Sequence, residues 1–157
     1  MTVKAIPDGY HTLTPYMTVR DAARAIEFYK QAFGAVERGV AKGPDGKIMH
    51  AELRIGDSVF MLADEYPEFG SLSPQSTGGS GMGLHVYTDD VDSAFDRAVK
   101  AGAKVDMPVG DMFWGDRYGK LSDPFGHKWS IATHKRDMSE EEMKDEMMKQ
   151  MPMPKSA

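Results

Sequence analysis

The 157-residue chain contains no cysteine. Without a thiol there is no disulfide, no thiolate nucleophile and no cysteine-based zinc site, and the composition is compatible with a reducing compartment. No stretch reaches the run of about 18 apolar residues that crosses a bilayer. Residues 1–11 also lack the apolar run of a signal peptide. We therefore expect a cytoplasmic protein with no membrane partner.

Positive charge is also scarce. The sequence has 19 Lys and Arg residues against 24 Asp and Glu, which gives a net charge of −5 and a pI of about 5.5. Nucleic-acid binding depends on clustered Lys and Arg, so we expect no nucleic-acid partner. With 41% hydrophobic and 27% charged residues, the composition is that of an ordinary globular protein.

One strand-and-helix pattern occurs twice in the chain. Residues 12–19 alternate small polar and apolar side chains, as a half-buried strand does, and Asp21 follows at a helix N-cap position. A second strand-like stretch, 83–88, leads into Asp89 and Asp90. Each cap is followed by an apolar stripe of helical spacing, and the two stripes are offset by a constant 69 residues: Ala22, Ile26, Tyr29 and Phe33, then Val91, Phe95, Ala98 and Gly102.

Strand patterns follow each helix. They cover residues 35–42, 47–55 and 58–62 in the first half, and 104–114, 117–122 and 127–134 in the second. Each half therefore has the order β-α-β-β-β. The stretch rich in Gly, Ser and Pro between the halves is a linker. We predict one α+β domain over 1–135, made of a module at 11–66, a linker at 67–82 and a module at 83–135.

The composition changes after Lys135. Ser139 and Glu142 have the spacing of a capping box, which predicts a helix within 136–157 that Pro152 and Pro154 end. Methionines four residues apart give this charged helix an apolar stripe. We expect the stripe to pack on the domain or on a sister subunit; a methionine-rich docking surface is the alternative.

The faces of four predicted strands divide into an apolar and a polar set. Because strand side chains alternate, the apolar set can be covered by the two helices, which leaves a polar face. His and Tyr on that face favour a small-molecule pocket over a solvated surface, and Phe113 with Trp114 could add an aromatic wall. The candidate ligand-binding residues are Thr14, Tyr16, His50, Glu52, Arg54, His85, Tyr87, Trp114 and Ser130.

The ordered combination of these motifs resembles the vicinal oxygen chelate superfamily, which includes glyoxalases, bleomycin-resistance proteins and extradiol dioxygenases. The likeness rests on residues 16–21 and 25–35, on 89–92 with 101–103, and on the Asp-Pro-x-Gly ending at 123–126. It covers about residues 11–134. The resemblance implies two βαβββ modules that form a cupped mixed sheet, with helices on the outer face and a C-terminal helix beyond.

The resemblance also implies where a divalent metal would bind. Carried onto this sequence, the family's four ligand positions fall at Thr14, Glu52, Gly83 and Ser130, of which only Glu52 is a good ligand. We therefore expect no metal and no other cofactor. A displaced metal site of Glu52, His50 and His85 is the alternative.

Three functions remain open. The first is a metal-independent protein that binds an aromatic or polar small molecule between its modules, as the family's resistance members do. The second is a lyase, isomerase or dioxygenase that uses a noncanonical metal or an acid/base pair, for which Glu52 and His85 are the best catalytic candidates. The third is a dimeric scaffold without a ligand. We expect a homodimer, and we predict that Glu52 and His85 face one shared cavity.

Overall fold

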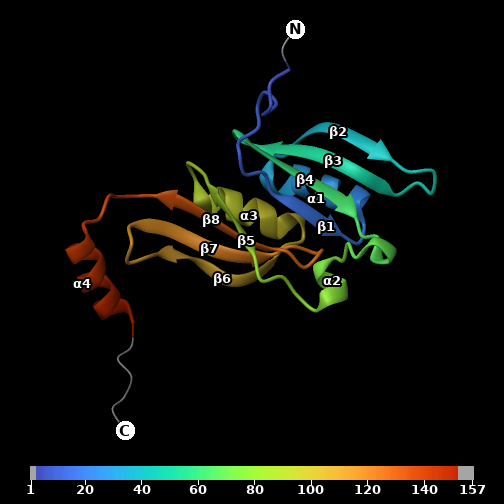
Figure 1. Cartoon of the computed structure of the whole chain (residues 1–157). Coiled ribbons are helices and arrows are strands. Elements are labelled where there is room, and N and C mark those ends of the chain that lie inside the picture. Colours follow the sequence, from blue (N-terminus) through green and yellow to red (C-terminus); the bar gives the residue numbers. More distant parts are fainter. Residues whose placement is uncertain (1–2, 152–157) are drawn as a thin grey trace.

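The computed structural model describes residues 3–151 and contains two mixed sheets of four strands each (Figure 1). The first sheet has the order β1-β4-β3-β2, with β1 parallel to β4 and the other neighbours antiparallel. The helix of this module follows its first strand. The elements are β1 (Tyr16–Val19), α1 (Ala22–Phe33), β2 (Val36–Lys42), β3 (Ile48–Ile55) and β4 (Ser58–Asp64).

The second module repeats this arrangement. Its sheet has the order β5-β8-β7-β6, with β5 parallel to β8. A 3-10 turn, η1 (Pro67–Phe69), and a short helix, α2 (Pro74–Thr77), join the modules. The remaining elements are β5 (Gly83–Tyr87), α3 (Val91–Ala101), β6 (Lys104–Asp111), β7 (Asp116–Ser122), β8 (Lys128–His134) and α4 (Glu140–Gln150). The predicted α+β fold with two βαβββ modules and a C-terminal helix is confirmed.

The two central helices begin at equivalent caps. The Asp21 carboxylate accepts from the Arg24 backbone N–H, and that of Asp90 accepts from Ser93, each satisfying a free amide of the first turn. Gly34 ends α1 in the left-handed conformation that glycine adopts without strain. Because the caps and stripes are alike, the two helices lie in the same way on their sheets.

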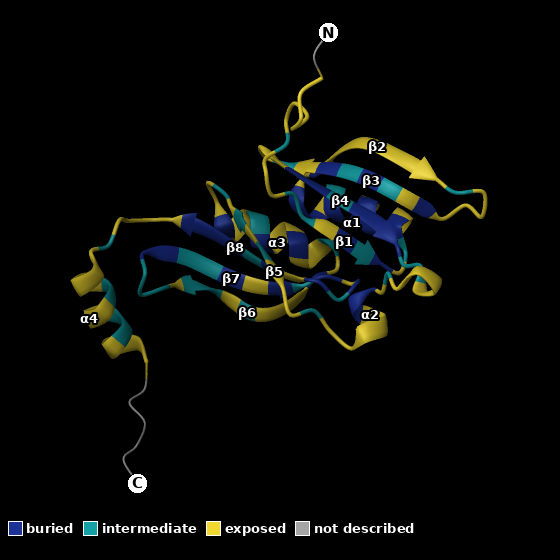
Figure 2. Cartoon of the chain, in the orientation of Figure 1, coloured by how far each residue is buried: buried dark blue, intermediate teal, exposed yellow. Residues whose placement is uncertain are grey.

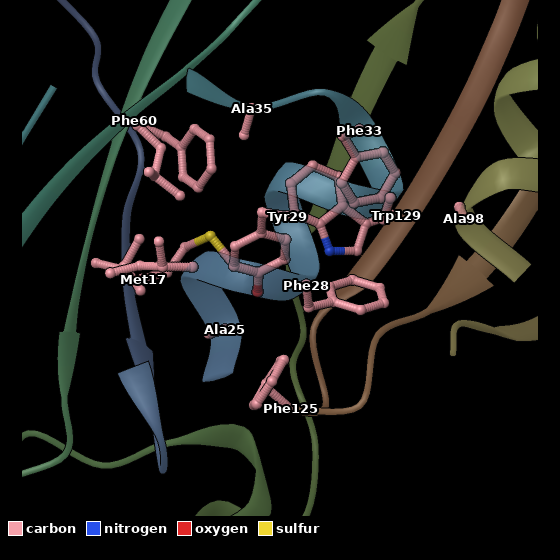
Figure 3. Packing of buried hydrophobic residues seen from close by; sticks show 14 of the residues in the cluster. Met17, Ala25, Phe28, Tyr29, Phe33, Ala35, Phe60, Ala98, Phe125 and Trp129 are labelled. Atoms are coloured by element: carbon pink, nitrogen blue, oxygen red, sulfur yellow. The ribbon is translucent and has the colours of Figure 1, made fainter. Parts of the chain in front are cut away.

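The modules share one hydrophobic core on the helix side of both sheets. Helices α1 and α3 pack against each other at the centre of the molecule (Figure 1). Trp129 of β8 stacks on Phe33 of α1 with ring centroids 4.3 Å apart, and it also contacts Tyr29 and Phe60 of the first module (Figure 3). Figure 2 shows the buried residues gathered in this central region. The helix-covered faces of both sheets are therefore turned toward one core.

Buried hydrogen bonds also cross between the modules. Asp123 accepts from the Tyr29 hydroxyl at 2.7 Å and from the Trp129 indole N–H at 2.9 Å. Its other oxygen accepts from the backbone N–H groups of Phe125 and His127. The His127 Nε2 lies 2.9 Å from the Thr18 carbonyl oxygen, so the ring donates across the module boundary. His127 thus has a structural position in the core.

The segment between the modules is held to the domain by Glu65. This carboxylate accepts from the Ser76 hydroxyl, the Ser73 backbone N–H and the Arg20 guanidinium. Ser73 is fully buried. The predicted linker therefore contains ordered turns that pack on the first module.

Helix α4 stands apart at the end of the second sheet (Figure 1). It has the predicted capping box of Ser139 and Glu142, but none of its described residues is buried. Met143 and Met147 of the stripe are partly buried and Met151 is 59% exposed, so the stripe is only partly covered within its own chain. The predicted helix end at Pro152 and the tail after it lie outside the described residues. Between residues 3 and 151, none of the helices is long and apolar enough to span a membrane.

Candidate functional site

Each sheet has one face that no helix within residues 3–151 covers, and we call it the open face. In the first sheet, Tyr16, Met61 and Glu52 are register partners on this face, while Leu53 and Leu62 point into the core. In the second sheet, the open face carries His85, Tyr87, Tyr118, Lys120 and Ser130. The predicted division into apolar and polar faces thus describes both sheets.

A chain of hydrogen-bonded side chains lies on the open face of the first sheet. The Tyr16 hydroxyl is 3.0 Å from His50 Nδ1, and His50 Nε2 is 3.3 Å from a Glu52 oxygen. The Tyr10 hydroxyl beside Glu52 is buried and has no partner of normal hydrogen-bond geometry among residues 3–151. Its proximity nevertheless lowers the pKa of Glu52, and His50 adds to this against the effect of burial. Glu52 therefore carries a negative charge at neutral pH.

The open face of the second sheet is centred on His85. Its Nδ1 lies 2.7 Å from the Ser130 hydroxyl, and its ring contacts those of Tyr87 and Tyr118. Burial lowers the pKa of His85, and the nearby Asp116 charge only partly opposes this. The imidazole is therefore neutral at physiological pH.

Asp116 is a buried carboxylate that holds several rings in place. It is 3% exposed and accepts from the Tyr87 hydroxyl, the Trp114 indole N–H and His134. Burial alone would raise its pKa, but hydrogen bonds from His134, Trp114 and Tyr87 outweigh burial and lower it. Asp116 is therefore negatively charged, and it lies behind the aromatic side chains of Tyr87 and Trp114.

Two other predicted site residues lie at the margins. Thr14 precedes β1, and its hydroxyl donates to the His11 carbonyl. Arg54 lies at the end of β3 and donates to the Gly56 carbonyl beside it. The predicted first strand, 12–19, is shorter in the structure because only Tyr16–Val19 pair with β4.

Glu52 and His85 belong to separate groups within one chain. Glu52 contacts His50, and His85 contacts Ser130 and two tyrosines. No hydrogen bond or aromatic contact between described residues joins the two open faces, because the modules meet on their helix-covered sides. Within one chain, His85 lines the cavity at the junction of the modules, whereas Glu52 lines another cavity with Tyr10 and Thr14.

The strand registers identify related positions in the two modules. Tyr16 pairs with Met61 in the first sheet, and His85 pairs with Ser130 in the second. Each residue of the second pair follows its counterpart in the first by 69 residues, the offset that also relates the two helices. The counterpart of Ser130 is thus Met61, whereas Glu52 corresponds to Lys120 through its register.

The positions onto which the resemblance places metal ligands do not provide a suitable donor set for a divalent ion. Thr14 and Ser130 carry neutral hydroxyls and Gly83 has no side chain, which leaves Glu52 as the one carboxylate of the four. In the part of the chain that the structure describes, no three His, Asp or Glu side chains are grouped to hold a metal. The residues present therefore do not fit the metal that the fold implies.

A cavity of about 540 Å³ lies at the junction of the modules. It reaches from the approach to β1 and the start of β4 to β5, and it includes His85 and Tyr87 at its rim. Most of its lining is apolar: Leu13, Pro15, Ile55, Val59, Phe60, Leu84, Val86 and Trp129. Its lining is less polar than that of the pocket that strand parity predicts.

Three residues of these groups were not among the sequence candidates. Tyr10 lies before the first strand, where no periodicity indicates its position. Tyr118 shares the alternating face of β7, so parity applied to residues 117–122 would have identified it. Asp116 depends on three distant donors, and local sequence gives no signal for it.

Comparisons with known proteins agree with this fold. The family model for the Glyoxalase/Bleomycin resistance protein/Dioxygenase superfamily matches residues 10–131. The chain is 45% identical over 141 residues to the uncharacterized protein Rv0887c of Mycobacterium tuberculosis, covering 88% of this chain and 83% of that protein.

Solved structures give the same result. TioX from Micromonospora sp. ML1 is 27% identical with a TM-score of 0.62, covering 79% of this chain and 98% of its own. The Arabidopsis thaliana At5g48480 product is 29% identical with a TM-score of 0.61, covering 78% and 98%.

Proposed function

Because the chain belongs to the Glyoxalase/Bleomycin resistance protein/Dioxygenase superfamily, we propose that it binds a small molecule with aromatic and polar groups, without a metal. The binding site is a cleft between two copies of the chain in the cytoplasm. In this homodimer the open face of the first sheet of one copy faces the open face of the second sheet of its partner. The observation that carries the proposal is the position of the His, Tyr and Glu groups on faces that no described helix covers, with the segment before β1 lining the cavity beside Glu52.

The two open faces have complementary chemistry. The first offers a charged carboxylate, an imidazole and a phenol from Glu52, His50 and Tyr16. The second offers aromatic rings and the neutral imidazole of His85. Tyr16 is 51% exposed and Tyr87 is 63% exposed, which leaves aromatic surface free for a ligand. Together they make a site that combines stacking with a few orienting polar groups.

Mixing two damaged subunits tests the arrangement. Thermal melting with a panel of metabolites and antibiotics first identifies a stabilising ligand, because binding to the native state raises the melting temperature. The Glu52→Ala and His85→Ala proteins are each expected to lose that shift. A heterodimer of the two variants regains one intact site and therefore part of the binding.

Light scattering provides the control for assembly. A monomer that binds the ligand with full affinity would contradict the shared cleft. The Leu84→Trp variant, which fills the junction cavity, tests whether the ligand binds there instead. If this variant loses binding while Glu52→Ala and His85→Ala retain it, the ligand binds in the junction cavity. A dimer that no ligand stabilises would favour the scaffold function.

One observation favours an enzyme as the second candidate. Tyr16, His50 and Glu52 form a carboxylate–imidazole–phenol series in which the carboxylate orients the ring and the ring exchanges a proton with the phenol. The test is to incubate a ligand with the protein and to follow it by mass spectrometry. Product formation that is lost in His50→Asn, with the melting shift retained, would support catalysis.

A further inference from the structure

Four aromatic rings surround a small residue on the open face of the second sheet. Ala132 pairs with Tyr87 on one side and with Tyr118 on the other, and it is fully buried although its strand position faces outward. The rings of His85 and Tyr87 meet at 83° with centroids 4.6 Å apart. Those of Trp114 and Tyr118 meet at 77° with centroids 5.3 Å apart. The two ring pairs therefore present both faces and edges around the small side chain of Ala132.

A buried negative charge lies behind this group. Asp116 accepts from the Tyr87 hydroxyl at 3.2 Å and from the Trp114 indole N–H at 3.0 Å. The hydrogen bonds fix the positions of both rings, so little side-chain freedom is lost when a ligand binds. They also place the negative charge of Asp116 next to rings whose faces already carry partial negative charge.

We propose that this aromatic group binds a small organic cation of the methylated-ammonium class. The inference rests on the proposed function, since it names the ligand chemistry of one half of the shared cleft. A methylated ammonium has low hydration and a spread positive charge, which are the properties that aromatic faces recognise. The carboxylate of Asp116, which also accepts from His134 at 2.7 Å, supplies the opposite charge from behind the rings.

Other ligand classes fit less well. An anion placed on these rings would meet both the electron-rich faces and the charge of Asp116. His85 does not repel a cation, because its imidazole is neutral. Lys120 belongs to the neighbouring register row with Ser130 and is exposed, so water and salt screen its charge. In the proposed dimer, Glu52 of the facing copy would add a second carboxylate.

The experiment compares choline with 3,3-dimethylbutan-1-ol, a neutral molecule of the same shape. Isothermal titration of the full-length protein measures both, and fluorescence reports on the half-buried Trp114. We expect choline to bind about tenfold more tightly than the alcohol, the ratio that a partly desolvated cation–π contact gives. Equal affinity, or no binding of either molecule, would overturn the inference.

Variants separate the charge from the rings. Asp116→Asn should weaken choline binding about tenfold while changing the affinity for the alcohol little, because only the charge is lost. Tyr118→Leu, which leaves Asp116 intact, should remove the preference for choline. Phe69→Leu is the matched control at an aromatic residue that is 83% exposed and away from the group, and it should bind as the wild type does. An unchanged choline preference in the Tyr118 variant would overturn the inference even if the Asp116 variant fails to fold.

The two proposals fail in different ways. Choline binding by a protein that light scattering shows to be monomeric would support this inference and contradict the shared cleft. A dimer whose cleft binds other ligands but not choline would contradict the inference alone.

Discussion

At the scale of single residues, Asp123 is the main polar connection between the modules. The Tyr29 hydroxyl donates to it in the core, where burial and the carboxylate raise the pKa of Tyr29 well above its ordinary value. Tyr29→Phe removes one donor from a buried charge, so we expect unfolding free energy to fall by about 2 kcal/mol in urea titrations. Tyr66→Phe is the matched control, because the Tyr66 hydroxyl is buried without a described partner and its removal should be neutral or stabilising. Equal losses in both variants would show that the Asp123 bond adds nothing.

Gly119 illustrates how closely α3 packs on the second sheet. A Cβ atom at this position would lie 2.6 Å from the Phe95 ring and 3.0 Å from a Val109 methyl group. Gly119→Ala should therefore strain the core and reduce stability by about 1–3 kcal/mol, measured by urea unfolding. Gly39→Ala is the control, since nothing lies within 4 Å of the added methyl group. A stable Gly119 variant would mean that the helix can move away from the sheet at little cost.

At the scale of elements, Glu65 makes the connection between the modules sensitive to acid. Three hydrogen bonds, led by that from Ser76, lower its pKa to about 2. A carboxyl with a depressed folded pKa stabilises the structure above its unfolded value of 4.5, and this contribution is lost as the pH falls toward 2. Hydrogen exchange should show residues 67–82 losing protection over that range before the sheets do. The Glu65→Gln protein should lack this acid step; an identical step in both proteins would assign it to another group.

Local patterns in the sequence were sufficient to predict most elements. The stripes of α1 and α3 and the turn at 43–46 depend on near neighbours, so the predicted and observed helices and strands largely coincide. The strand predicted at 104–114 ends at Asp111, and the first strand differs more. Residues 12–15 alternate as a strand does, but β4 offers them no partner beyond the Pro15 carbonyl, which accepts from Met61. Strand length thus depended on a neighbour 45 residues away in the register, which alternation does not report.

At the scale of the whole molecule, the candidate site was only partly predictable. Parity placed Tyr16, His50, Glu52, His85 and Ser130 on the polar faces of their strands, and the structure joins the first three and the last two by hydrogen bonds. How the two faces lie relative to each other depends on the packing of Trp129 against α1. That contact joins residues about 100 positions apart, and no periodicity in the sequence indicates it.

The shared core also predicts that neither module folds alone. Separation would expose Trp129 and Phe33, which stack across the boundary, and would leave Asp123 without Tyr29 and His127 without the Thr18 carbonyl. Chains of fewer than about 80 residues rarely bury enough apolar surface to offset such losses. Fragments 1–70 and 80–157 should therefore each show poorly dispersed NMR spectra and no cooperative melting. Mixing two fragments cut within the Gly-rich segment 78–81 should restore dispersion, since the core contacts do not depend on chain continuity. A single fragment that melts cooperatively would show that the modules are independent domains whose contact is incidental to folding.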